Sequence, residues 1–185
     1  DNSSTDNTLD LIKSQNKKNI YLYNIDNKGV VASSRNLGIK NSKGKYVAFL
    51  DSDDWWLPKK IEISIIELEK GFDIVYHDLF HAYDNSLKPH FWRRSRTRNL
   101  HIPVYRDLLI NGNAINLSSV VIRKVLMEEI NGFSQDIKLV SSEDYETWIR
   151  ISIKTNKFSK INNVLGFYWK GGGNMTSLQL TLTSM

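Results

Sequence analysis

A short apolar run that breaks into carboxylates constrains this chain more than any other feature. Residues 46–56 read Tyr-Val-Ala-Phe-Leu-Asp-Ser-Asp-Asp-Trp-Trp. The apolar part, 46–50, shows no alternation, which is typical of a strand covered on both faces. Ligands of open α/β sheets bind just outside the carboxyl ends of such strands. The sequence therefore predicts a buried strand that ends at a ligand-binding rim.

Four polar residues occupy that rim, namely Asp51, Ser52, Asp53 and Asp54. Clustered carboxylates repel one another and are costly to desolvate, so they stay ionised mainly where a cation or solvent balances them. Hard oxygen ligands suit Mg²⁺ or Mn²⁺, and these ions in turn neutralise phosphate oxygens. The segment therefore indicates a site for a divalent metal and a nucleotide diphosphate. The alternative is a solvated Asp/Ser turn that only ends the strand.

The chain has 185 residues, near the usual size of one domain, and we expect a single domain over 1–185. No apolar run reaches the roughly 18 residues that a membrane span requires. The first residues contain neither a basic region nor an apolar signal core. The absence of cysteine excludes disulfides and thiolate metal sites and is compatible with a reducing cytosol. Any metal site must therefore use oxygen or histidine, and we expect a cytoplasmic location.

Helix and strand signals alternate along the first half of the chain. We expect helices at 6–14, 29–41, 58–71, 124–131 and 143–155, and strands at 20–24, 46–50, 72–77, 116–123 and 164–169. In the helix after Pro58, the spacing of Ile61, Ile65 and Leu68 predicts the buried stripe. Such alternation favours an α/β fold whose sheet is mostly parallel and flanked by helices. We expect a hairpin or variable loops over the irregular stretch 78–110.

The net charge of +5 is spread unevenly. Five arginines gather in one aromatic segment: Arg93, Arg94, Arg96, Arg98 and Arg106. Such a cluster could attract a phosphorylated acceptor, anionic lipid headgroups or nucleotide phosphates. It could also be a nucleic-acid patch or simply a solvated loop.

Four motifs in this chain resemble the family 2 glycosyltransferases of the GT-A fold. Residues 51–60, Asp-Ser-Asp-Asp-Trp-Trp-Leu-Pro-Lys-Lys, resemble the family's Asp-x-Asp-Asp, aromatic and x-Pro-x-Lys pattern. Residues 1–8 are similar to its Asp-Asp/Asn-Gly-Ser-Thr-Asp turn. Residues 27–29 with 34–39 resemble its Asn-x-Gly and Ala-Arg-Asn-x-Gly-Ile segments, and 142–150 resemble its Glu-Asp-x-(Asp/Glu)-x-Trp-x-Arg helix. The motifs follow the family's order across most of the chain.

The resemblance implies that a sugar moves from a nucleotide-diphosphate donor, expected to be a UDP-sugar, to an acceptor hydroxyl with inversion. By this resemblance Asp144 is the catalytic base. Its alternative role is a carboxylate that favours the helix N-terminus. On the donor side, Asp51 and Asp53 are the expected ligands of Mn²⁺ or Mg²⁺.

The resemblance also assigns nucleotide-binding residues, which are Asp1, Asn2, Arg35, Asp51 and Ser52. For Asp1 and Asn2 the alternative is a turn that caps the first helix, and for Arg35 a surface ion pair. Weaker candidates for donor or acceptor contact are Glu143, Trp56 and Lys170. Residues 1–78 are then the nucleotide-binding half, and 79–185 the half that holds the acceptor and the base.

The expected partners are a nucleotide-sugar and a saccharide or lipid-linked saccharide acceptor, in surface polysaccharide or glycolipid synthesis. The sequence leaves open an oligomer and peripheral contact with the inner face of a membrane, and we expect no nucleic-acid partner. Alternative functions are a non-catalytic nucleotide- or glycan-binding remnant of a transferase, or a nucleotidyltransferase.

Two departures from the family pattern affect the N-terminal region. Ser3 stands where the family prefers glycine, so a positive φ there would carry strain of around 1 kcal/mol. The family's first strand and helix precede the Asp turn, whereas this chain begins at the turn, so we expect an N-terminally truncated domain.

Overall fold

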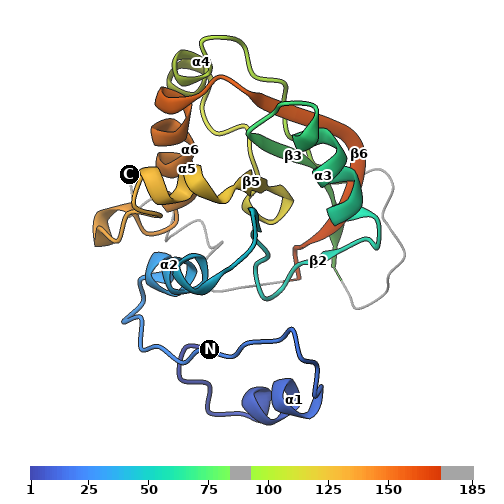
Figure 1. Cartoon of the computed structure of the whole chain (residues 1–185), viewed down its shortest axis with the longest axis vertical. Helices are drawn as coiled ribbons and strands as arrows, with labels where there is room; N and C mark the ends of the chain where they lie inside the picture. Colours follow the sequence, from blue (N-terminus) through green and yellow to red (C-terminus); the bar gives the residue numbers. More distant parts are fainter. Residues whose placement is uncertain (84–92, 172–185) are drawn as a thin grey trace.

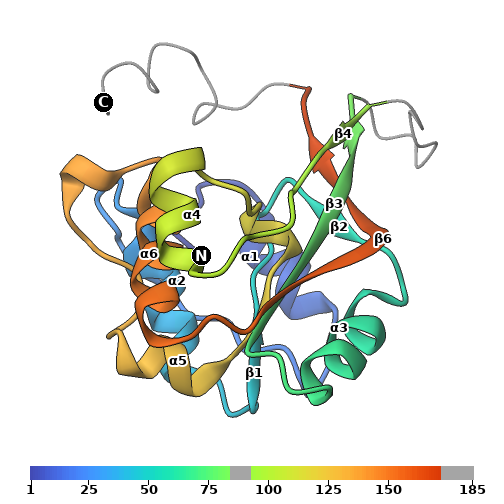
Figure 2. The ribbon, with the colours of Figure 1, turned by 90° about the horizontal axis from the view of Figure 1, so that it is seen from above.

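The computed structural model describes residues 1–83 and 93–171. Within these residues one mixed sheet has the strand order β1-β5-β3-β6-β2, and β4 pairs with the outer part of β3. The strands are β1 (Tyr46–Ala48), β2 (Trp55–Trp56), β3 (Ile74–Ala82), β4 (Arg94–Ser95), β5 (Val121–Arg123) and β6 (Phe158–Trp169). Figure 2 shows β3 and β6 running side by side through the middle of the molecule.

Helices cover the sheet unequally. The α-helices are α1 (Thr8–Ser14), α2 (Val31–Asn41), α3 (Lys60–Glu69), α4 (Val104–Asn111), α5 (Lys124–Glu129) and α6 (Glu143–Lys154). In Figure 2, α2, α4, α5 and α6 lie on one side of the sheet and α3 on the other. Among the described residues no helix is long and apolar enough to cross a bilayer.

Each face of the sheet has its own apolar cluster. The larger cluster lies under α2, α4, α5 and α6 and includes Phe49, Phe133 and the fully buried Trp148. The smaller cluster joins Leu68 of α3 to Val75 and Leu165 of the sheet. Because both faces are covered, β3 is buried along most of its length, which explains its apolar start at Ile74–Tyr76. His77 and Asp78 are buried polar residues within the same strand.

The expected α/β fold is present, but the sheet is not mostly parallel. Among the described strands only β3 and β6 pair in parallel, and β1, β2, β4 and β5 all pair antiparallel. The alternation rule assumes a helical crossover before each strand. Instead, β2 follows the acidic loop directly and runs back along β6, and β5 follows a 3₁₀ turn, Leu117–Ser119.

Three local predictions were wrong. Residues 20–24 form no strand in the structure, because no described strand lies beside them. In α3, Ile61 and Ile65 are 38% and 36% exposed, and the buried face consists of Lys60, Ser64 and Leu68. Helix α4 lies in the stretch predicted to be irregular. The hairpin expected there is present as the pairing of β4 with β3, although residues 84–92 lie outside the described residues.

Candidate active site

The acidic loop follows β1 and is held against the segment that leads into β5. The N–H of Phe49 donates to the carbonyl of Val120 at 3.4 Å, and the N–H of Asp51 donates to the hydroxyl of Ser118 at 3.1 Å. The loop closes on itself where the N–H of Asp54 donates to the carbonyl of Asp51. These bonds fix where the carboxylates begin, just beyond the end of a sheet strand as predicted.

Asp54 is the buried member of the acidic loop. Its Oδ1 accepts from the N–H of Trp169 at 2.9 Å, while Oδ2 has no hydrogen-bond partner among the described residues. Burial raises the pKa of Asp54 to about 6, against smaller opposing effects of Ser118 and the Trp169 N–H. Asp54 therefore joins the loop to the end of β6, while Asp51 and Asp53 remain more accessible to a ligand.

Arg35 of α2 joins the acidic loop to the start of α6. Its two terminal nitrogens donate to Asp51 Oδ1 at 2.9 Å and to Glu143 Oε1 at 2.5 Å. Glu143 is buried, and its second oxygen has no hydrogen-bond partner within the described part of the chain. The ion pair considered for Arg35 is thus present, but it is partly buried and connects two candidate site residues. Arg35 therefore orients the carboxylates of Asp51 and Glu143.

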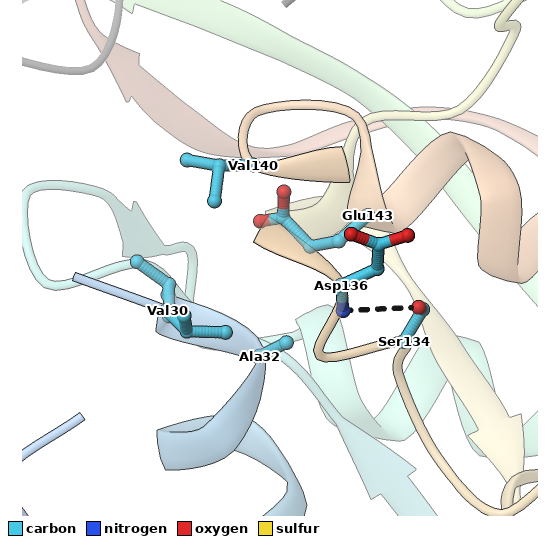
Figure 3. A pocket seen from close by; sticks show the side chains of 7 residues that line it. Val30, Ala32, Ser134, Asp136, Val140 and Glu143 are labelled. Carbon is cyan, nitrogen blue, oxygen red and sulfur yellow. Dashed lines mark hydrogen bonds between the residues drawn. The ribbon is translucent and has the colours of Figure 1, made fainter. Parts of the chain in front are cut away.

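Glu143 also borders a small pocket between the start of α2 and the segment that leads into α6. Figure 3 shows its carboxylate between Val140 and the side chain of Asp136. The N–H of Asp136 donates to the Ser134 hydroxyl at 3.3 Å. The pocket has a volume of ≈ 10 Å³, about the space of one water molecule. This pocket is too small to bind a substrate group. Its lining residues instead pack around the Glu143 side chain.

Asp144 is the second residue of α6, after Glu143, and lines a second, larger cleft. Its Oδ1 accepts from the N–H of Tyr145 at 2.6 Å. Burial raises the pKa of Asp144 to about 6; the Tyr145 N–H opposes this, and the charge of Glu143 adds to it. The sequence had suggested only the repulsion by Glu143. A carboxylate with this pKa is ionised at neutral pH and is a stronger base than an ordinary aspartate.

The larger cleft brings together residues far apart in the sequence. It has a volume of ≈ 290 Å³, and its lining includes Asp51, Arg96, Thr97, Asn113, Asp144 and Tyr168. Asp51 comes from the predicted nucleotide-binding half and Asp144 from the other half. The predicted metal ligand and the predicted base therefore share one open cleft of a size suited to a small ligand.

The carboxylates of the acidic loop fit a hard divalent cation. Asp53 is exposed, and Asp51 uses only one of its oxygens for Arg35. Within the described residues no group of three or more His, Cys, Asp or Glu side chains converges on one point. Mg²⁺ usually takes one or two carboxylates and completes its shell with waters and substrate phosphates. Asp51, which lines the cleft, and Asp53, two residues further along the acidic loop, supply that number of carboxylates.

The other predicted nucleotide-binding residues lie apart from the cleft lining. Both carboxylate oxygens of Asp1 accept from Ser4, and Asn2 Oδ1 accepts from the N–H of Asn27 at 2.9 Å. These two side chains hold the N-terminal turn, but neither caps the first helix, because α1 begins at Thr8 after Asn7. Nucleotide binding by Asp1 and Asn2 stays a prediction. Ser52 is exposed on the acidic loop.

The two remaining weak candidates, Trp56 and Lys170, occupy different surroundings. Trp56 Nε1 donates to the carbonyl of Ser118 at 2.7 Å. Lys60 Nζ lies 4.5 Å from the centre of the Trp56 ring. The Trp56 ring is thus held by Ser118 and Lys60 and does not line the cleft. Lys170 is exposed, with Nζ 4.7 Å from the ring of Tyr168, which lines the cleft.

Sequence reasoning missed three residues that shape the site. Ser118 accepts from Asp51 and is fully buried. Lys60 is also fully buried, with Nζ 3.3 Å from the carbonyl of Val120. Arg96 lines the cleft but was noted only as one of five arginines. The Pro-x-Lys part of the motif was a signal for Lys60, whereas nothing in the local sequence distinguishes Ser118 or Arg96 from their neighbours.

Comparisons with known proteins place this arrangement in a family. The sequence profile described as Glycosyl transferase family 2 matches residues 1–128. Two relatives from Escherichia coli are named as UDP-Glc:alpha-D-GlcNAc-diphosphoundecaprenol beta-1,3-glucosyltransferases. WfaP is 29% identical over 96% of this chain and 66% of its own length. WfgD is 31% identical over 88% of this chain and 59% of its own length. The chain therefore spans less than two thirds of these relatives.

Solved structures support the same assignment at the level of fold. The structure of S. aureus TarS residues 1–349 in complex with UDP-GlcNAc matches with a TM-score of 0.73 and 18% identity, covering 99% of this chain and 53% of that one. At that identity the likeness concerns the fold, and it confirms the GT-A architecture expected from the four motifs. Because the family profile covers more than half of the sequence, this chain belongs to glycosyl transferase family 2.

Proposed function

We propose that the protein transfers a sugar from a UDP-sugar to a hydroxyl of a lipid-linked saccharide, with inversion and with the help of a divalent metal. The observation that carries this proposal is the shared cleft of Asp51 and Asp144. Asp51 would face the donor diphosphate, and Asp144, whose pKa is raised by burial, would act as the base. Membership in the family supports the transferase activity.

On the donor side, Asp51 and Asp53 would hold Mn²⁺ or Mg²⁺. The bound ion would stabilise the negative charge that develops on the departing nucleoside diphosphate. Arg35 holds Asp51 in a fixed orientation through its bond of 2.9 Å, and the Ser118 hydroxyl holds the backbone of the same residue. A preorganised carboxylate loses less freedom when the donor arrives.

On the acceptor side, Asp144 would take the proton of the attacking hydroxyl. The acceptor oxygen forms a bond to the anomeric carbon, the bond from that carbon to the diphosphate breaks, and the proton moves to the Asp144 carboxylate. Attack from the face opposite the leaving group inverts the anomeric centre. The pKa of about 6 supports this role, because the group is ionised at neutral pH yet accepts a proton more readily than an ordinary aspartate.

The acceptor and its location are proposed from the relatives. WfaP and WfgD are named for an acceptor that is a sugar on diphosphoundecaprenol. An acceptor of this kind would bring the protein to the cytoplasmic face of a membrane, in the synthesis of a surface polysaccharide or glycolipid. The cleft is open to solvent, so a saccharide that stays attached to a membrane lipid could reach Asp144.

Thermal unfolding with UDP, GDP and CDP, each with and without Mn²⁺, tests the donor side. We expect UDP with Mn²⁺ to raise the unfolding temperature, because a ligand that binds only the folded state stabilises it. Asp53→Ala should lose the metal-dependent part, while Asp10→Ala, an exposed aspartate on α1, should keep it. A UDP effect without metal dependence would indicate a nucleotide-binding remnant, and no effect of any nucleotide would contradict the proposal.

A further inference from the structure

Of the five clustered arginines, three have partners among the described residues. Arg94 pairs with Asp78 at 3.5 Å, and Arg98 pairs with Asp107 at 2.7 Å. Arg93 lies over the ring of Tyr83, with its guanidinium carbon 6.0 Å from the ring centre. These three are explained by the packing of the β3–β4 hairpin and of the segment that leads into α4. They leave Arg96 and Arg106 to be accounted for.

Arg96 differs from Arg106 in its position. Both are exposed, and within the described parts of the chain neither forms an ion pair. Arg96, however, lines the cleft that contains Asp51 and Asp144, whereas Arg106 lies on the outer surface of α4. A guanidinium at the edge of the candidate active site, without a carboxylate of its own, has its donors available for a ligand.

The wall around Arg96 is rich in hydrogen-bond donors. Asn113 and Asn116 also line the cleft, and each uses its side-chain oxygen to accept a backbone N–H, from Ile115 at 3.0 Å and from Ser118 at 3.1 Å. With the oxygens so engaged, the amide nitrogens remain as donors. The cleft is therefore divided chemically: Asp51 and Asp144 supply carboxylates, and Arg96, Asn113 and Asn116 supply donors.

We propose that Arg96, with Asn113 and Asn116, binds the phosphate groups of the acceptor, so that this wall selects saccharides carried on a lipid diphosphate. The inference rests on the proposed function, since it assigns the acceptor side of the same cleft. Arginine suits the task because its planar fork matches phosphate oxygens with two parallel hydrogen bonds. Under the proposed function the donor diphosphate would bind at the acidic loop, where Asp51 and Asp53 would hold a metal ion that offsets its charge.

Calorimetric titration with geranyl diphosphate, in the presence of saturating UDP and Mn²⁺, tests the inference. UDP fills the donor site, so any binding of geranyl diphosphate that remains is binding to Arg96, Asn113 and Asn116. We expect Arg96→Gln to weaken binding by about tenfold to a hundredfold, which corresponds to the loss of charge-assisted hydrogen bonds. Arg96→Lys should recover part of the affinity, and Arg106→Gln should bind as the wild type does. Geraniol, which lacks the diphosphate, should not distinguish the variants.

The outcomes separate this inference from the proposed function. Equal affinity of Arg96→Gln and wild type for geranyl diphosphate would overturn the inference. Loss of wild-type binding when UDP is added would also overturn it, because the arginine would then serve the donor. In both cases UDP binding itself stays intact and the proposed function stands. If UDP does not bind while geranyl diphosphate still depends on Arg96, the phosphate site is upheld and the proposed function fails.

Discussion

Residues 1–30 and the rest of the described chain, 31–171, are built on different principles. Within 1–30 the only buried residue is polar, Asn27, and α1 buries no residue at all. Large apolar side chains such as Leu11 and Tyr21 are 55% and 68% exposed. In contrast, Trp148 of the larger part is fully buried within an apolar cluster. Figure 1 shows α1 and its flanking segments away from the sheet and its helices.

Asn27 connects the N-terminal segment to the larger part by a hydrogen bond to Ser34. Asn2 accepts from the N–H of Asn27, and the Asn27 amide donates to the Ser34 hydroxyl of α2 at 2.9 Å. Each such bond contributes about 1 kcal/mol net, whereas burial of one large apolar side chain contributes about 1.5–3 kcal/mol. The segment that holds one family motif and the start of a second is therefore the less firmly packed one. The presence of a family motif in a segment therefore does not indicate how firmly that segment is packed.

The largest expected effect contrasts Asp144 of the larger part with Asp1 of the N-terminal segment. Asp144→Asn should lower turnover by about a hundredfold to ten-thousandfold, as expected for loss of a positioned base, with donor binding unchanged. Asp1→Ala should instead weaken UDP binding and leave turnover at saturating donor nearly intact, since it removes uniform binding. Steady-state kinetics and UDP titration measure both. Wild-type turnover in Asp144→Asn would remove this residue from the role.

The pH dependence gives an independent check on Asp144. Its pKa is raised to about 6, and the base works only when ionised. Turnover should therefore rise as pH increases through about 6 and level off above pH 7. Asp54 also has a pKa of about 6, so its own titration must be separated. Asp54→Asn should keep the same acid limb if Asp144 is responsible, and a limb that vanishes in Asp54→Asn would assign it to Asp54.

The second comparison concerns stability. Trp148→Ala removes a fully buried ring and should lower the free energy of unfolding by about 3–5 kcal/mol. Leu11→Ala in the exposed α1 should change it by no more than about 0.5 kcal/mol. Urea denaturation measures both values. A large effect of Leu11→Ala would show that the N-terminal segment packs against something in solution and would break the comparison.

The sequence predicted the parts of the site that lie in local motifs. The strand before Asp51 and the helix that begins at Glu143 were both expected from their own residues, and the structure has them as β1 and α6. That Asp51 and Asp144 share a cleft followed only from the family resemblance. Nothing within either segment specifies the other, because the two are joined through the intervening sheet and through Arg35.

Contacts between distant segments explain what the sequence did not predict. Periodicity in α3 placed Ile61 inside, yet Lys60 is buried because its amine reaches the carbonyl of Val120 and the face of Trp56. Ser118 matters because Asp51 bonds to it across 67 positions of chain. The sheet is mixed because β2 runs back along β6. Each of these depends on a partner that local pattern does not reveal.

The fourth prediction uses Lys60, the buried amine of the larger part. Burial lowers the pKa of Lys60 to about 7 from its ordinary 10.5. Between these values the unfolded chain holds more protons, so stability should rise with pH from about 7 to 10, with a slope of up to about 1.4 kcal/mol per pH unit. Lys60→Met should flatten this rise, while Lys59→Met, at an exposed neighbour, should retain it. Urea denaturation at several pH values measures the slope, and equal slopes in both variants would contradict the burial argument.

The smallest expected effect returns to the N-terminal segment. Ser3 has a φ of 55°, the left-handed conformation that the family's glycine suggested. Ser3→Gly should relieve strain and stabilise the turn by about 1 kcal/mol or less, because glycine also gains freedom in the unfolded chain. Asn16, with a φ of 43°, is the matched control, since asparagine tolerates this region and Asn16→Gly should gain less stability.

Hydrogen exchange of the amides in 1–30 measures the stability of this segment even if the segment opens separately from the rest. If Ser3→Gly slows exchange there while the global unfolding free energy stays constant, the two regions unfold independently. If both rise together, the hydrogen bonds through Asn27 couple them into one cooperative unit.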